Sequence, residues 1–187
     1  MRTAIGALLA VVAALAAGCS DGLPPDLATE AAPPQAAELG WKEQIPESGP
    51  AMVFRVHRFA VTERGWEADV EVQNRTDVMW EIPGALSAVT TSFGVMLFRT
   101  GGLEELDQRN RQDDLPGLRE ADVYEPALPN SLAPGEGWRG TISARGSLAA
   151  GLYVRIVFGL FAAEGDPPEG IDSPFSWITD HAYRLQR

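Results

Sequence analysis

The chain of 187 residues contains one cysteine, so no disulfide bond can form within it. It is also poor in positive charge, with 15 Lys and Arg against 26 Asp and Glu and a formal net charge of −11. Such an acidic chain repels phosphate backbones, and we expect no nucleic-acid partner. The sequence has no G-x-S-x-G, H-E-x-x-H, Walker or G-x-G-x-x-G motif. We therefore expect no catalytic residues, no cofactor and no metal.

The N-terminal segment has the order of charges and apolar residues that is typical of an export signal. Arg2 carries a positive charge, and residues 4–17 (AIGALLAVVAALAA) carry none. This stretch fits the apolar core of a secretory signal and is too short to span a bilayer as a helix. Small residues then lead to the only cysteine, in the sequence Leu15-Ala16-Ala17-Gly18-Cys19.

This last stretch resembles the bacterial lipobox, in which small residues precede the cysteine that becomes the first residue of the mature protein. The resemblance implies a signal peptide at residues 1–18, cleavage between Gly18 and Cys19, and a diacylglyceryl group on Cys19. Two acyl chains anchor a protein stably, whereas one binds only marginally. The implied location is the lipid bilayer, on the outer face of the cytoplasmic membrane, or the outer membrane in a cell with two. The alternative is an ordinary secretory signal with a chance cysteine.

Residues 19–50 are expected to form a tether. They hold six of the fourteen prolines of the chain, and residues 27–37 (LATEAAPPQAA) contain no aromatic side chain. Pro-rich segments are semi-rigid spacers of about 3.1 Å per residue, so this tether could reach on the order of 100 Å.

Residues 51–187 show the alternation of apolar and polar residues that is typical of half-buried strands. In residues 66–73 (WEADVEVQ) every second side chain is apolar, with Trp66 in phase, and Trp138 shows the same pattern further on. A change of phase between Val56 and Phe59 predicts a β-bulge. The run at residues 153–161 (YVRIVFGLF) predicts a central strand. About seven short strands and no long helical periodicity predict an all-β fold, an antiparallel β-sandwich.

Two stretches, residues 68–77 (ADVEVQNRTD) and residues 132–159 (LAPGEGWRGTISARGSLAAGLYVRIVFG), resemble signatures of bacterial immunoglobulin-like modules. These signatures recur in envelope lipoproteins and in intracellular proteinase inhibitor (BsuPI)-type domains. The resemblance implies an immunoglobulin-like sandwich. Asn74 and Thr76 would hold a turn through their side chains, and Gly135 and Gly151 would relieve backbone strain. Such signatures describe folding and do not identify an activity.

An acidic insert at about residues 100–130 interrupts the strands, with eight acids and three arginines. Residues 103–106 (LEEL) predict the start of a short helix, and Leu115-Pro116 predicts its end. Long loops are usually functional or mobile, so a partner-binding loop and a solvated loop both remain open. A calcium site is disfavoured, because Asp113-Asp114 does not match the D-x-D-x-D-G pattern. The candidate partner-binding residues are Glu104, Glu105, Asp107, Asp113, Asp114, Trp80 and Trp177, the two tryptophans because aromatic residues concentrate at binding hot spots.

Together these patterns predict a membrane-anchored extracytoplasmic lipoprotein with a non-catalytic binding or structural role in the cell envelope, and an envelope protein as its partner. One alternative is a protease inhibitor of the BsuPI-like type, which needs a rigid exposed loop. Another is a hydrolase acting on cell-wall material, which needs two carboxylates about 5–10 Å apart in a cleft. Asp180-His181 is not expected to act as an acid–base pair, because neighbours on a strand point to opposite faces.

Overall fold

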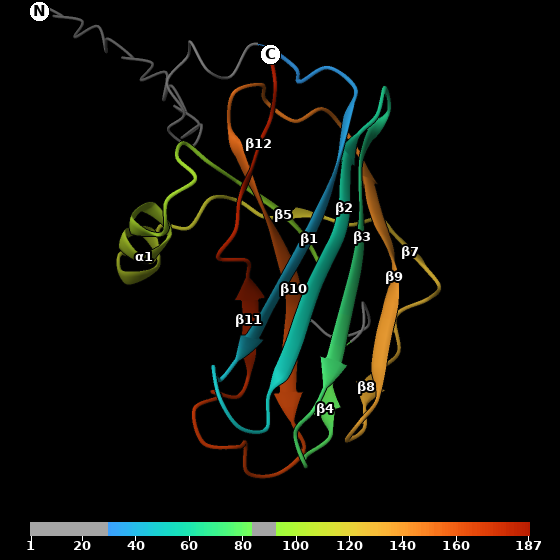
Figure 1. Cartoon of the computed structure of the whole chain (residues 1–187), viewed down its shortest axis with the longest axis vertical. Helices are drawn as coiled ribbons and strands as arrows, with labels where there is room; N and C mark the ends of the chain where they lie inside the picture. The colour runs from blue at the N-terminus through green and yellow to red at the C-terminus, as the bar shows by residue number, and fades with distance from the viewer. Residues whose placement is uncertain (1–29, 84–92) are drawn as a thin grey trace, which may run out of the picture.

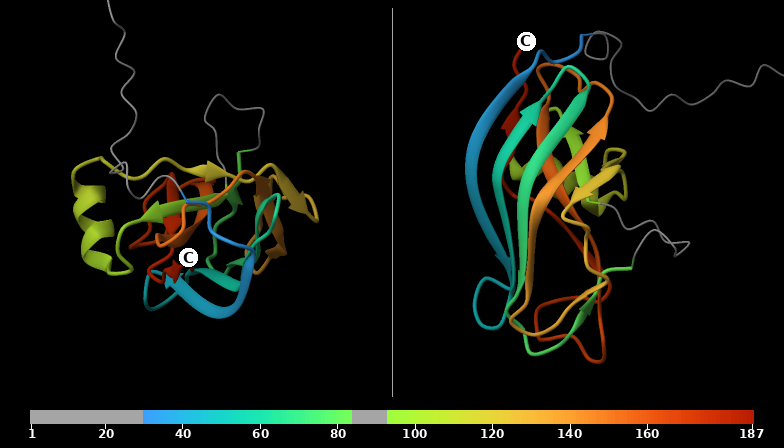
Figure 2. Two further views of the ribbon diagram at one scale, coloured as in Figure 1. Left: turned by 90° about the horizontal axis from the view of Figure 1, so that it is seen from above. Right: turned by 90° about the vertical axis from the view of Figure 1, so that its right-hand side faces the viewer.

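Two antiparallel β-sheets packed face to face make up the protein in the computed structural model, which describes residues 30–83 and 93–187 (Figure 1). Strands account for 49% of the described residues and helix for 6%. The expected all-β sandwich is thus confirmed. Figure 2 shows the two layers from above and from the side.

The first sheet contains the long strands and has the order β1-β2-β3-β9-β7. Its members are β1 (Gln35–Ile45), β2 (Met52–Val61), β3 (Gly65–Asn74), β7 (Val123–Glu125) and β9 (Gly137–Arg145). The expected bulge is present, because the register between β2 and β3 shifts between Val56 and Arg58. Thr62 and Gly65 close the β2–β3 hairpin with a backbone hydrogen bond of 2.8 Å.

The second sheet is built around β10 and has the order β6-β5-β10-β4-β8, with β11 and β12 also paired to β10. Its members are β4 (Trp80–Glu81), β5 (Gly94–Phe98), β6 (Arg119–Glu120), β8 (Ser131–Leu132), β10 (Tyr153–Ala163), β11 (Phe175–Ile178) and β12 (Tyr183–Arg184). The prediction that residues 153–161 form a central strand is confirmed. The described residues hold twelve strands rather than about seven, because several pieces span only two residues and are too short for periodicity to detect.

The main core lies between the two sheets and is rich in aromatic side chains. Trp66 and Trp138 are buried in it, at 2% and 6% exposure, as their phase predicts. Phe54 stands at its centre, 4.9 Å from the ring of Phe158 and 5.6 Å from that of Trp177. Burying such side chains is the main favourable contribution to folding.

Asn74 holds the turn after β3, as expected. The side chain is fully buried, and its Oδ1 accepts hydrogen bonds from the backbone N–H and the hydroxyl of Thr76 at 2.9 and 2.7 Å. Its Nδ2 donates to the carbonyl of Val78 at 2.8 Å and to that of Leu132 at 2.9 Å. Asn74 therefore ties β8 to the turn as well. Gly135 and Gly151 both have positive φ, 82° and 79°, as expected of residues that relieve strain.

The expected boundary between tether and domain at residue 50 is wrong. Residues 35–45, placed in the tether, form β1 and pair with β2 along its length. Even before β1, the backbone N–H of Ala32 donates to the carbonyl of Leu148 at 2.8 Å. The alternation along β1 is weak in the sequence because Ala and Gly fill many positions and the buried Glu43 is charged. Residues 19–29 of the expected tether, and the signal peptide at residues 1–18, lie outside the described residues.

The acidic insert is more ordered than a loop. It contains α1 (Leu103–Arg111), β6 and β7, and the helix lies beside the second sheet (Figure 1). The helix begins at the predicted residue and ends at Arg111, four residues before Leu115.

Candidate functional site

The insert covers the outer face of the second sheet. Side chains alternate along a strand, so Met96 and Phe98 of β5 point away from the core that Val95 and Leu97 enter. Leu106 of α1 packs with Met96, Phe98 and Val157 in a second apolar cluster and is 8% exposed. The insert is therefore a structural cover for an apolar sheet face.

Arg155 lies under this cover and is fully buried. Its Nη1 donates to the carbonyls of Thr179 (2.7 Å) and Asp180, and its Nη2 donates to those of Gly101 (3.0 Å) and Gly102 (2.8 Å). A guanidinium carries four Nη hydrogens, so each of them has a carbonyl acceptor. Arg155 thereby joins the start of the insert to the C-terminal segment.

The charge of Arg155 has no carboxylate in direct contact within the described residues. Its guanidinium lies over the ring of Phe98, at 5.3 Å from the ring centroid. Burial lowers the pKa of Arg155, and the more distant charges of Asp180 and Glu43 oppose that shift. The sequence analysis missed this residue. A single arginine inside the apolar run at 153–161 was the available signal, because a buried guanidinium needs hydrogen-bond acceptors.

Glu43 forms a second buried polar junction, between β1 and the C-terminal segment. Its carboxylate accepts hydrogen bonds from the indole N–H of Trp177 (2.7 Å) and from the backbone N–H groups of Asp180 and His181, both at 3.0 Å. The imidazole Nδ1 of His181 lies 2.7 Å from the Glu43 Oε1. Because β1 belongs to the first sheet and Trp177 to the second, Glu43 connects the two sheets at their seam.

His181 is oriented by Glu43 and by the ring of Trp41, which stacks on it at 5.5 Å. Burial and the charge of Glu43 raise the pKa of the neighbouring Asp180. A histidine oriented by a carboxylate is one part of a general base, but nucleophilic catalysis also needs a hydroxyl or thiol in contact with the ring. Among the described residues the ring of His181 hydrogen-bonds only to Glu43. Asp180 and His181 lie between β11 and β12 rather than on a strand, so the strand argument does not apply to them.

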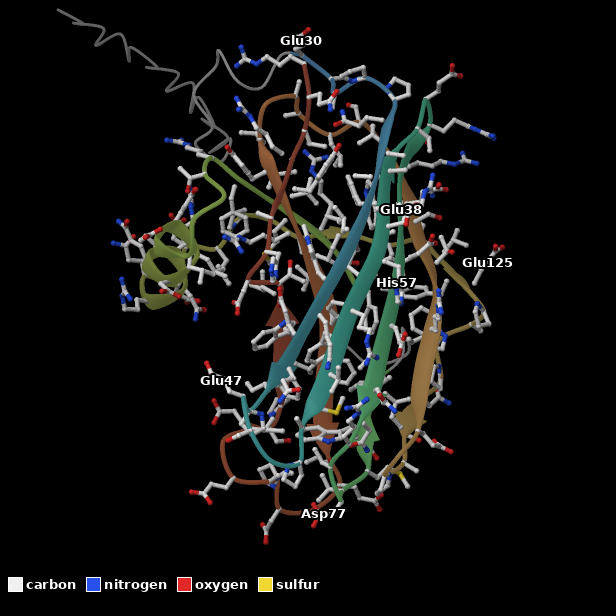
Figure 3. All side chains as sticks on the ribbon, viewed as in Figure 1. Glu30, Glu38, Glu47, His57, Asp77 and Glu125 are labelled. Atoms are coloured by element: carbon white, nitrogen blue, oxygen red, sulfur yellow. The ribbon has the colours of Figure 1, made fainter. Side chains whose placement is uncertain are left out.

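The other histidine, His57, lies on the outer face of the first sheet (Figure 3). Its Nε2 is 3.1 Å from Glu71 Oε2, and Arg55 donates to the other oxygen of the same carboxylate. These three side chains form a partly exposed ion-pair group that joins β2 to β3.

The acidic residues predicted to contact a partner differ in their surroundings. Glu105 is occupied, since it accepts hydrogen bonds from the backbone N–H groups of Arg99 and Thr100, from the Thr100 hydroxyl and from Arg109. Partial burial favours a higher pKa for Glu105, but these hydrogen bonds outweigh it and lower the pKa. Asp114 is paired with Arg109 at 3.2 Å.

The remaining candidates divide into exposed acids and packed tryptophans. Glu104, Asp107 and Asp113 are exposed, and none forms an ion pair with any described residue. Trp80 is wrong as a surface contact, because it is fully buried in the core and donates its N–H to Thr76 at 3.0 Å. Trp177 is partly buried, and its indole N–H is occupied by Glu43. A groove of about 610 Å³ runs beside α1 and includes Glu104.

Within residues 30–83 and 93–187, no three His, Cys, Asp or Glu side chains are grouped in a way that could hold a metal ion. In the same ranges no helix has the length and apolarity needed to cross a membrane. Gly18 and Cys19 lie outside the described residues. The chain matches no family model, no curated protein and no solved structure.

Proposed function

We propose that the protein is an extracytoplasmic lipoprotein, anchored through acylated Cys19, with a non-catalytic binding or structural role in the cell envelope. The observation that carries the proposal is the sequence Leu15-Ala16-Ala17-Gly18-Cys19, which follows an uncharged apolar segment and holds the only cysteine of the chain. The domain begins soon after this cysteine. Glu30 is only eleven residues after Cys19, and its carbonyl already accepts the backbone N–H of Ala150 at 2.9 Å. Eleven residues span at most about 40 Å when fully extended. The anchor would hold the sandwich close to the bilayer.

With an anchor at Cys19, this short connection would favour one end of the sandwich facing the lipid. We call the end that holds Glu30, the β2–β3 turn, the β9–β10 loop (146–152) and Arg187 the proximal end. The distal end holds the loops at 46–51, 75–79, 131–136 and 164–174 (Figure 3, where Glu30 and Asp77 mark opposite ends). The distal loops and the exposed side of α1 would remain accessible to an envelope protein.

Intact-mass measurement on the protein purified from bacterial membranes tests the anchor. The wild-type chain should lack residues 1–18 and carry the added mass of a diacylglyceryl group. Cys19→Ser should carry no lipid, because serine has no thiol to alkylate, whereas the neighbouring control Ser20→Ala should be processed like the wild type. Unmodified Cys19 in the wild-type protein, or intact residues 1–18 in soluble cytoplasmic protein, would refute the proposal.

Crosslinking in the native envelope tests whether the exposed side of α1 binds a partner. Deleting the insert is unsuitable, because it would uncover Met96, Phe98 and Val157. Glu104→Gln with Asp107→Asn removes two exposed charges without touching that contact. A crosslinked protein lost in this variant, and retained in a variant with two distal acids neutralised, would identify α1 as the contact. Equal crosslinking in both would exclude α1.

A further inference from the structure

The β9–β10 loop is surrounded by arginines. Arg145 immediately precedes it, and the carbonyl of Arg64 accepts the backbone N–H of Gly146 at 3.1 Å. Arg119 donates to the carbonyl of Ser147 at 3.2 Å. Arg187 lies over the far end of the loop, where a Cβ added to Gly151 would be 3.0 Å from its Nε. The name "arginine loop" is used below for the β9–β10 loop together with these four arginines.

Three of these guanidinium groups are uncompensated. Arg64, Arg145 and Arg187 are exposed, and their side chains form no ion pair or hydrogen bond with any described residue. Arg64 and Arg145 line a groove of about 370 Å³ beside the β2–β3 turn.

Two carboxylates line the same groove. Glu67 is paired with Arg58 at 2.7 Å, whereas Asp122 is exposed and accepts only the backbone N–H of Arg145 at 3.4 Å. The groove thus presents two unpaired arginine side chains beside one exposed carboxylate, and an external anion can pair with the arginines.

The arginine loop is also the place where the chain leaves the domain toward Cys19. Ala31 forms an isolated β-bridge with Ala149, in the middle of the loop. Eleven residues allow at most about 40 Å between Cys19 and Glu30, so this loop stays within that reach of the anchor.

Charge is distributed unequally between the two ends. The distal loops, together with Glu81, contain eight carboxylates and one arginine: Glu47, Asp77, Glu81, Glu136, Glu164, Asp166, Glu169, Asp172 and Arg75. The proximal end contributes Glu30 and Glu63 in its turns and Glu67 and Asp122 in the groove, and Glu67 is paired with Arg58. An anionic surface therefore repels the distal end far more than the proximal end.

We infer that the arginine loop binds the phosphate groups of anionic lipids and holds the sandwich upright on the bilayer, with its acidic end outward. This inference rests on the lipid anchor proposed above. Arginine matches phosphate geometry with its planar fork of N–H donors. Juxtamembrane basic residues are attracted to anionic leaflets, and a domain already tethered within tens of ångströms needs only weak contacts to stay docked.

The test uses the full lipidated protein reconstituted into vesicles of phosphatidylcholine alone or of phosphatidylcholine mixed with phosphatidylglycerol. Ser147→Cys places a thiol in the arginine loop, and Asp166→Cys places one at the distal end. Because Cys19 is alkylated, each new thiol is the only one available to a polarity-sensitive dye. The dye at position 147 should respond to phosphatidylglycerol and lose that response at high salt, which screens the contact. The dye at position 166 should not respond.

Arg64→Gln with Arg145→Gln tests the residues themselves. Each arginine lost should reduce the ratio of docked to undocked protein about fivefold. The matched control removes two exposed arginines elsewhere, Arg75→Gln with Arg139→Gln, and should leave the response at position 147 unchanged.

Flotation with the vesicles separates the two proposals. If the protein floats with both kinds of vesicle but the dye at position 147 does not respond to phosphatidylglycerol, the docking proposal is refuted and the anchor proposal stands. An equal loss of response in the Arg75→Gln, Arg139→Gln control would also refute the docking proposal. Protein that floats with neither kind of vesicle would remove the anchor and the docking together.

Discussion

Replacing Arg155 tests whether one buried side chain attaches the insert to the sandwich. Arg155→Met keeps an unbranched apolar stem on β10 and removes all four hydrogen bonds to the carbonyls of Gly101, Gly102, Thr179 and Asp180. Arg155→Lys keeps the charge but offers three hydrogens from a single nitrogen, which cannot reach both pairs of carbonyls as a planar fork does.

The expected cost follows from these contacts. A hydrogen bond from a charged donor contributes about 1.5–3 kcal/mol, so four contribute roughly 6–12 kcal/mol before any offset. Burying the guanidinium costs several kcal/mol, and the Gly101 and Gly102 carbonyls are partly accessible to water once freed. We expect Arg155→Met to lower the free energy of unfolding by about 3–5 kcal/mol, and Arg155→Lys by about 2–3 kcal/mol. This is a large part of the 5–15 kcal/mol that stabilises an ordinary domain.

The assay is chemical denaturation followed by circular dichroism, with limited trypsin digestion as a local readout. Arg109 and Arg111 of α1 should be cut earlier in Arg155→Met, because the start of the insert is no longer held. Arg139→Met is the matched control, since Arg139 is an exposed arginine of β9 and its loss should change stability by no more than about 0.5 kcal/mol. An Arg155→Met protein within about 1 kcal/mol of the wild type would refute the reasoning.

Two further substitutions test other polar contacts. The pKa of Glu105 lies below its ordinary value of 4.5, so its carboxylate stabilises the fold above that pH and the contribution is lost as the pH falls through the lower folded-state pKa. The free energy of unfolding of the wild type should therefore fall more steeply from about pH 5 to pH 3 than that of Glu105→Gln, and parallel pH profiles would contradict this. Asn74→Ala removes the amide that donates to the carbonyls of Val78 and Leu132, and the Val78 carbonyl keeps only the longer contact of 3.3 Å from the Thr76 hydroxyl. It should cost about 2–4 kcal/mol in urea denaturation, and a cost below about 1 kcal/mol would show that water replaces the amide.

Short-range patterns in the sequence were reliable guides to local structure. The bulge in β2 follows from the phase change after Val56, and the turn after β3 follows from Asn74 and Thr76. Each of these features is determined by a few neighbouring residues, because side-chain period and turn chemistry are local properties of the chain. The same locality explains the error at β1, where small residues and Glu43 leave too little alternation to separate a strand from a tether.

The candidate contacts of the insert were harder to predict, because their exposure depends on partners far away in the sequence. Glu105 and Asp107 both read as free acids, yet Glu105 is occupied by the backbone of Arg99 and Thr100 while Asp107 is exposed. Trp80 was a candidate contact and is buried, because β4 is covered on its inner side by the first sheet.

The sequence by itself determined the all-β class, the central strand at residues 153–161 and the main turns, since periodicity and turn residues act over a few positions. Only the tertiary structure decided that β1 joins the first sheet, that Arg155 and Glu43 fasten the insert and the C-terminal segment, and that arginines gather where the chain enters the domain. These features depend on residues separated by up to 138 positions, as in the contact of Glu43 with His181. No local pattern encodes such pairs, because the free energy that selects them comes from burial and polar satisfaction across the folded chain.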